Sequence, residues 1–324
     1  MKSILTFTMV MVLACGAAAD EIFVPDNQPG TGSTNVIPFK GSFMKTDCRY
    51  QALYKASYFN GNSFTIKDIA FASTYTGQLD TTRMQIRISH FTGSALSPTM
   101  DLNIPAPVTV LDASPHVYSA AVANSWCPIG LTCSFVYNGT DNLVIDIRYT
   151  GGKNTGSHGG FRYTKGAIPR NWAYGNFNAV TQSGSDTSAG LKTRFTVEPI
   201  SITASGTPKP GGTVLLDLVA PGDGTLTYQV GSSFGTGPIG IDCRQLALSF
   251  DALLIITVNG QLPTVFMNFG GNLSTAGKAQ ASVAIPSIPA LVGISFYSAF
   301  TTIKVGEPSN IKSISPSTMV TITS

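Results

Sequence analysis

The segment Arg83–Phe91 reads RMQIRISHF, and its pattern decides the fold of the region around it. Apolar side chains occupy every second position, at Met84, Ile86 and Ile88, and polar side chains lie between them. Successive side chains of an extended strand point to opposite faces of a sheet. The segment is therefore predicted to be a strand with one face on a core and the other in water.

The same alternation recurs further along the chain. In Asn142–Thr150, the side chains of Leu143, Ile145, Ile147 and Tyr149 share one side, and those of Val144, Asp146 and Arg148 share the other. Charged residues make up only 11% of the chain, whereas Gly (33) and Pro (19) are abundant. This composition is typical of many short strands joined by turns.

The pattern breaks near Glu198-Pro199 and restarts as a second series of strand-like runs. The apolar positions from Leu246 to Val258 also recur with period two and lead into an Asn259-Gly260 turn, which predicts a long strand before a hairpin. We therefore expect an all-β protein of two antiparallel β-sandwich domains of the jelly-roll or immunoglobulin type, spanning residues 20–198 and 199–324.

A different period appears in RYQALYKASYF, Arg49–Phe59. Its apolar residues Tyr50, Leu53, Tyr54 and Tyr58 have the spacing of one helix face. Three helical turns are marginal unless they dock on something apolar. The segment is predicted to be a short helix or an irregular plug that belongs to the core and binds no ligand.

The N-terminus has the features of an export signal: one Lys, an apolar run from Ile4 to Ala14, and then small residues. Cleavage after Ala19 would remove residues 1–19 as a signal peptide. Alternatively, Val12-Leu13-Ala14-Cys15 would be processed as a lipoprotein signal, with a lipid anchor on Cys15. No later segment reaches the roughly 20 apolar residues of a transmembrane helix, so no membrane span is expected.

Four further cysteines suggest disulfides in an exported chain. Cys127 and Cys133 bracket a turn, and we expect them to pair. Cys48 and Cys243 fall in different predicted domains, so they would either bridge the two or remain free thiols.

The charge pattern and the motifs of the chain exclude several functions. The net charge is +3 without a Lys/Arg block, which argues against nucleic acid. Gly231-Ser232-Ser233-Phe234-Gly235 satisfies G-x-S-x-G, but the glycines and proline that follow are unsuited to the helix that a nucleophilic serine needs. The overlapping G-x-G-x-x-G at Gly235–Gly240 is followed by the expected period-two strand in place of a helix, and no Asp or Glu stands near the ribose position.

Metal and cofactor chemistry is equally poorly supported by the sequence. The histidines His90, His116 and His158 are isolated and do not have metal-ligand spacing. No cofactor is expected, although Asp217 or Asp223 would suit a structural calcium ion.

The span from Ile147 to Ser185 contains no acidic residue, and it combines basic with aromatic side chains. Aromatic rings stack on sugar faces, and guanidinium groups donate to hydroxyl or carboxylate oxygens. The predicted ligand-binding residues are Arg162, Tyr163, Arg170, Trp172 and Tyr174. The alternative is that Phe161 and Tyr163 are core positions of one more strand and the loop is merely cationic.

Two stretches resemble known bacterial sequences. RYQALYKASYF followed by FTIKDIAFAS resembles the opening of a β-rich domain in exported bacterial proteins. IPSIPALVGISFYSAF, Ile285–Phe300, is similar to a segment near the end of a small β-domain in secreted proteins of planctomycetes and other environmental bacteria. The resemblance implies an exported bacterial protein of two β-sandwich domains, and it supplies no catalytic residue.

Together these features predict an exported, non-enzymatic protein of the bacterial envelope or exterior that binds a polysaccharide or cell-surface glycan, or is adhesive. A purely structural envelope protein is the first alternative. A secreted hydrolase acting on a polysaccharide or an ester is the second.

Overall fold

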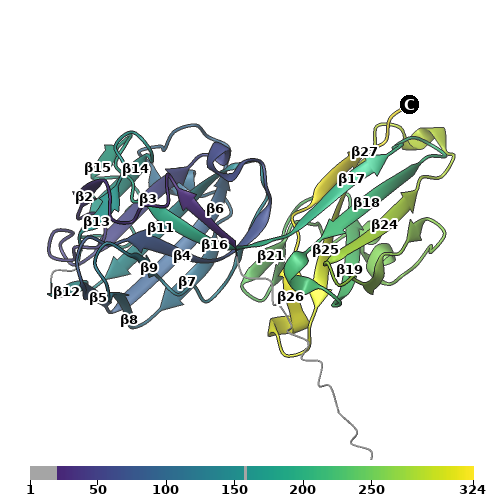
Figure 1. The fold of residues 1–324 in the computed structure, drawn as a ribbon. Coiled ribbons are helices and arrows are strands. Elements are labelled where there is room, and N and C mark those ends of the chain that lie inside the picture. The colour runs from purple at the N-terminus through teal and green to yellow at the C-terminus, as the bar shows by residue number, and fades with distance from the viewer. Residues whose placement is uncertain (1–19, 157–158) are drawn as a thin grey trace, which may run out of the picture.

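The computed structural model describes residues 20–156 and 159–324, which form two lobes of antiparallel strands (Figure 1). The predicted signal segment, Cys15 and His158 lie outside the described residues. The predicted all-β sandwich class is confirmed, because the helices of the described ranges are short. These are α1 (Ala252–Val258) and the 3-10 segments η1 (Ala56–Phe59), η2 (Met100–Asn103), η3 (Pro221–Asp223), η4 (Pro289–Leu291) and η5 (Pro308–Asn310).

The N-terminal lobe (residues 20–199) has two main sheets. In spatial order, the first contains β1 (Asp20–Val24), β16 (Thr193–Pro199), β4 (Phe64–Ala72) and β10 (Phe135–Tyr137), with β9 (Trp126–Pro128) also on β4. The second contains β15 (Gly184–Asp186), β14 (Arg170–Tyr174), β3 (Cys48–Tyr54), β11 (Asn142–Thr150), β6 (Arg83–Phe91) and β7 (Val108–Ala113). Buried side chains from both sheets form one hydrophobic core, so the core lies between them.

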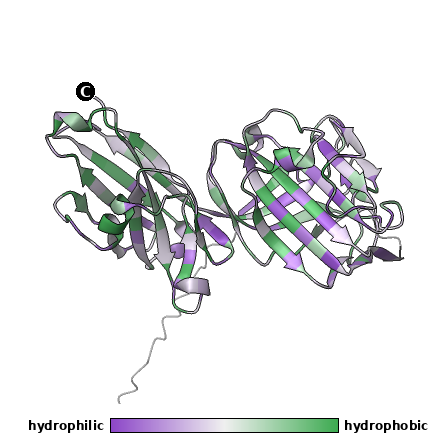
Figure 2. Cartoon of the chain, turned by 180° about the vertical axis from the view of Figure 1, so that it is seen from behind, coloured by the Kyte–Doolittle hydropathy of each residue, from purple (hydrophilic) through white to green (hydrophobic). Residues whose placement is uncertain are grey.

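Two smaller sheets complete this lobe. One contains β12 (Lys153–Gly156), β5 (Gly77–Thr81) and β8 (His116–Ala120), and the other pairs β13 (Phe161–Tyr163) with β2 (Ser33–Asn35). The hydropathy colouring alternates along the strands of the lobe, as the sequence pattern requires (Figure 2).

Strand β11 departs from the prediction of a half-buried strand, because its polar side is also covered. Asp146 is fully buried and lies opposite Gln51 of β3 and Arg87 of β6 in the sheet register. Its Oδ1 accepts from Arg49 Nε and Gln51 Nε2, both at 2.9 Å. Its Oδ2 accepts from Arg87 Nη2 at 2.6 Å and from Arg148 Nε at 2.8 Å. A buried charge persists only when it is paired and hydrogen-bonded, and this network meets that condition.

Arg49–Phe59 is not mainly helical, which corrects the prediction from its spacing. Its first part belongs to β3, which is buried along its whole length, and only η1 is helical. Both faces of β3 are covered, so apolar side chains occupy positions that also happen to match a helical period. The interpretation of the segment as core is confirmed, because Tyr50 and Tyr54 are fully buried.

The C-terminal lobe (residues 200–324) also has two main sheets around a core of its own. One contains β17 (Ser201–Gly206), β18 (Thr213–Val219), β24 (Lys278–Ala284) and β22 (Phe266–Met267). The other contains β23 (Gly270–Asn272), β19 (Thr227–Ser233), β25 (Ser295–Ile303) and β26 (Ile311–Ile314), with β27 (Thr318–Thr321) also on β25. A hairpin of β20 (Ile239–Ile241) and β21 (Arg244–Leu246) extends from this lobe.

The predicted long strand from Leu246 to Val258 is wrong. The chain leaves β21 and forms the helix α1, whose N-cap Asp251 accepts a hydrogen bond from Leu254 N at 3.0 Å. The helix packs on β19 at Gly231, where an added Cβ would lie 2.8 Å from the Leu254 side chain. The cap and the space above Gly231 therefore favour a helix over an extended strand.

The strands before and after the β16–β17 junction belong to different sheets and to different main cores. That each lobe is an independent domain stays a prediction.

Candidate functional site

Three of the five predicted ligand-binding residues lie together on one face of β14. The guanidinium carbon of Arg170 is 4.7 Å from the centre of the Trp172 ring, and the Trp172 and Tyr174 rings meet edge to face at 6.4 Å. The Trp172 ring also lies over Gly184 of β15, where an added Cβ would be 2.5 Å from Cζ2. The Trp172 ring therefore has protein partners on Arg170 and Gly184, and both Trp172 and Tyr174 pack against the core.

The other two predicted residues belong to a different sheet. Arg162, on β13, donates through Nη2 to Asn124 Oδ1 at 2.8 Å and through Nη1 to the Gly32 carbonyl at 3.1 Å. Tyr163 follows it on the same strand. The structure thus divides the predicted site between β13 and β14, and ligand binding by these residues stays a prediction.

The expected Cys127–Cys133 disulfide is wrong. Cys133 bonds to Cys243, whose Cα lies 6.0 Å away and 110 residues later in the chain. Cys127 and Cys48 are free, buried thiols. Nearness in sequence suggested the wrong partner, and the real bond joins the N-terminal lobe to the C-terminal lobe.

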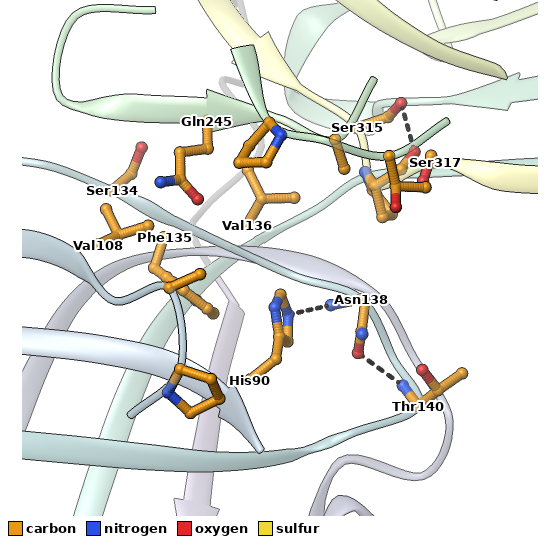
Figure 3. A pocket seen from close by; sticks show the side chains of 16 residues that line it. His90, Val108, Ser134, Phe135, Val136, Asn138, Thr140, Gln245, Ser315 and Ser317 are labelled. Carbon is orange, nitrogen blue, oxygen red and sulfur yellow. Dashed lines mark hydrogen bonds between the residues drawn. The ribbon is translucent and has the colours of Figure 1, made fainter. Parts of the chain in front are cut away.

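A cleft of about 530 Å³ lies between the lobes (Figure 3). Ser134 and Gln245, which line it, are one and two residues from the bonded cysteines. The N-terminal wall consists of His90, Pro105, Ala106, Val108, Ser134, Phe135, Val136, Asn138 and Thr140. The C-terminal wall consists of Thr236, Pro238, Gln245, Ala247, Ser315, Pro316 and Ser317.

Asn138 organises the N-terminal wall through a turn that follows β10. Its Oδ1 accepts from the backbone N–H groups of Thr140 and Asp141, both at 3.0 Å, and its own N–H donates to His90 Nε2 at 3.0 Å. Such side-chain turns fix the local backbone. In Figure 3 the same contacts hold His90, Asn138 and Thr140 side by side at the edge of the cleft.

His90 is a neutral hydrogen-bond acceptor in this arrangement. Burial lowers its pKa from 6.5 to about 4, against the opposing effect of Asp141. The ring packs 4.8 Å from Phe135, and its Nε2 is occupied by the Asn138 N–H group. His90 therefore has no free Nε2 lone pair with which to take a proton from a substrate.

Acidification is expected to destabilise the protein through His90. The His90 imidazole of the unfolded chain binds a proton near pH 6.5, whereas that of the folded chain binds one near pH 4. The contribution of His90 to stability is therefore complete above pH 6.5 and is lost as the pH falls from 6.5 to 4. The loss at pH 4 is about 2 to 3 kcal/mol. Urea unfolding at pH 7 and pH 4 measures it in the native protein and in His90→Gln.

The Gln side chain offers an acceptor to Asn138 but does not titrate, so it should remove this part of the pH dependence. His116, whose pKa burial also lowers, acts in the same direction and remains present in both proteins. An identical pH dependence in the two proteins would contradict the assignment to His90.

The cleft can bind a neutral polar molecule. None of its lining side chains is an acid, a lysine or an arginine. Hydroxyl and amide groups both donate and accept hydrogen bonds, and Phe135 and the prolines supply apolar surface. A groove of the C-terminal lobe has no such polar groups. Its lining is wholly apolar and includes Phe234, Leu253 and Ile322, so it offers sugar hydroxyls no side-chain partner.

The serine of the G-x-S-x-G match and the two aspartates considered for calcium form hydrogen bonds or ion pairs within the protein. Ser233 is buried, donates to the Gly235 carbonyl at 2.6 Å and accepts from Ser249 N at 3.1 Å, so its hydroxyl does not face a substrate. Asp223 pairs with Lys312 at 2.5 Å, and Asp217 accepts from Gln280 at 2.8 Å. Within residues 20–156 and 159–324, no three His, Cys, Asp or Glu side chains are grouped to hold a metal ion.

Among the described residues, no helix combines the length and apolar character needed to cross a membrane.

No protein-family model matches the chain, and no curated protein sequence matches it. Among solved structures, it is similar to Bifidobacterium dentium beta-glucuronidase complexed with coumarin-3-O-glucuronide, at 11% identity and a TM-score of 0.22. The match covers 85% of this chain but 39% of the enzyme chain, and at this score it carries no argument about function.

Proposed function

We propose that this protein is an exported, non-enzymatic bacterial protein that binds a neutral glycan in the cleft between its lobes. The observation that carries the proposal is the lining of the cleft, which combines hydroxyl groups, amide groups and apolar surface without a charged side chain. Ligand sites usually combine apolar walls with a few oriented polar groups. A neutral saccharide matches such a site, because its hydroxyls pair with the amides and its ring faces pack on Phe135 and the prolines.

The disulfide supports the proposed export, because such bonds persist in oxidising compartments. The Cys133–Cys243 bond also holds both walls of the cleft at one end. Export agrees with the apolar run from Ile4 to Ala14 and with the resemblance to secreted bacterial proteins. In this proposal the protein acts at the envelope or outside the cell, and processing at Cys15 would give it a lipid anchor.

Binding without catalysis agrees with the chemistry of the cleft. Glycoside hydrolysis uses two carboxyl groups that flank the scissile bond, and the cleft lining contains no carboxylate. The one imidazole in the lining has its Nε2 occupied by Asn138.

A glycan array followed by titration calorimetry tests the proposal. Gln245→Ala should weaken the affinity for a retained neutral glycan about tenfold, because it removes one or two hydrogen bonds. Trp172→Ala, which changes the aromatic cluster on β14, is the matched comparison and should leave the affinity unchanged. Weakening by Trp172→Ala alone would place binding at the site predicted from the sequence. Retention of no glycan would contradict the proposal and favour a structural envelope protein.

A further inference from the structure

We infer that the ligand is a linear oligosaccharide chain that lies across two joined hollows, and not a single sugar. The inference rests on the proposed glycan-binding function. A second hollow of about 920 Å³ lies beside the first, and the two share Asn138, Thr140, Pro316 and Ser317. Because four residues border both, the hollows meet along the Asn138–Thr140 turn and the segment before β27.

The volumes favour an extended ligand. Pockets for small molecules typically measure about 300 to 1,000 Å³. Each hollow alone reaches this range, at about 530 and 920 Å³, so the joined space exceeds what one or two sugars fill.

Amide, hydroxyl and apolar groups also line most of the second hollow. Asn62, Ser63, Ser201 and Thr203 supply amide and hydroxyl groups there, and Phe64 and Met319 supply apolar surface. Its charged side chains are Asp20 and Glu21 on β1, and Glu21 is paired with Arg194 at 3.0 Å. A neutral chain therefore meets amide, hydroxyl and apolar groups along both hollows, and the two carboxylates of β1 in the second hollow alone.

The strip between the hollows is held in place before any ligand binds. Ser315 is buried, accepts from Phe300 N at 2.8 Å and donates to the Pro316 carbonyl at 2.9 Å. On the opposite wall, Asn138 is fixed by its contacts to His90, Thr140 and Asp141. Both sides of the junction are thus preorganised, which lowers the entropy lost on binding an extended chain.

The length dependence of binding tests this inference. Titration calorimetry with three neutral series, the cello-, malto- and N-acetylated chito-oligosaccharides from one to eight units, should find one series whose affinity rises with length. We expect at least a tenfold gain between the disaccharide and the hexasaccharide, followed by a plateau. Equal affinity for the disaccharide and the hexasaccharide would overturn the inference while leaving the proposed glycan binding intact. Binding of no oligomer would overturn both.

Two variants locate the added sugars. Met319 is 57% exposed and, of the two joined hollows, lines the second alone, so Met319→Ala should weaken hexasaccharide binding several-fold and leave disaccharide binding unchanged. Met267→Ala, at a position 36% exposed on β22 and outside both hollows, is the control and should change neither affinity. Full hexasaccharide affinity in Met319→Ala, or an equal loss for both lengths, would overturn the inference.

Discussion

Replacing Cys243 with Ser is expected to lower the free energy of unfolding by about 4 to 5 kcal/mol. The Cys133–Cys243 bond links positions 110 residues apart, so it removes many conformations from the unfolded state. Urea unfolding of the oxidised native protein and of Cys243→Ser at one pH measures the difference. Glycan affinity should fall as well, because Ser134 and Gln245 border the cleft beside the two sulfurs.

Reductant provides the control for this experiment. Dithiothreitol, a dithiol, should lower the stability of the native protein to that of Cys243→Ser and leave the variant unchanged. Unfolding of the native protein at the same urea concentration with and without reductant would contradict a stabilising role for the bond.

The strands were predictable wherever the two sides of a strand differ in polarity. Arg83–Phe91 is a strand over the range that its alternation indicates, and it lies in the second sheet beside β11. Asn142–Thr150 is a strand with the expected bounds. The alternation did not reveal that the polar side of β11 is covered. Most of the hydrogen-bond partners of Asp146 lie on the neighbouring strands β3 and β6, which are distant in the sequence.

The predictions failed where the apolar positions fit both a strand period and a helical period. Between Leu246 and Val258 the sequence satisfies period two, but it also contains good helix formers after Asp251. An acidic residue just before such a run is a helix start signal, and here Asp251 caps α1. In Arg49–Phe59 the error is reversed. Arg49 and Gln51 mark one face of β3 as polar, but Leu53 lies on the same buried face and interrupts the alternation, so the apolar residues match a helical period.

The residues of the cleft could not be predicted from local patterns. His90, Asn138, Gln245 and Ser317 come from four separate segments, and none belongs to a motif. They meet because the lobes lie against each other and because one disulfide joins them. The basic and aromatic region around Trp172 was noticeable in the sequence, but the structure gives the Trp172 ring partners within the protein.

Asp146→Asn is expected to cost about 3 to 5 kcal/mol of stability, because it leaves buried guanidinium groups without their central counter-charge. The carboxylate of Asp146 is fully buried and forms ion pairs with Arg49, Arg87 and Arg148 at 2.6 to 2.9 Å. Of the three arginines, Arg49 is itself completely buried, and its remaining ion pair is with the half-exposed Asp101 at 2.8 Å. Asn keeps the shape of the side chain, removes its charge and replaces one acceptor oxygen by an NH2 donor, so urea unfolding of the variant measures the loss of the charge together with its hydrogen bonds.

Asp112→Asn is the matched control, because Asp112 also accepts two hydrogen bonds from one arginine, Arg83, but near the surface. Solvent screens that pair, so its loss should change stability far less.

A local measurement separates the roles of Asp146 and Asp112 further. Arg49 pairs with Asp101, and Gln51 donates to the Met100 carbonyl at 2.8 Å, so the network holds η2 against the sheet. Amide hydrogen exchange in η2 should therefore quicken in Asp146→Asn and stay slow in Asp112→Asn, and equal exchange in both would show that Asp146 does not anchor η2.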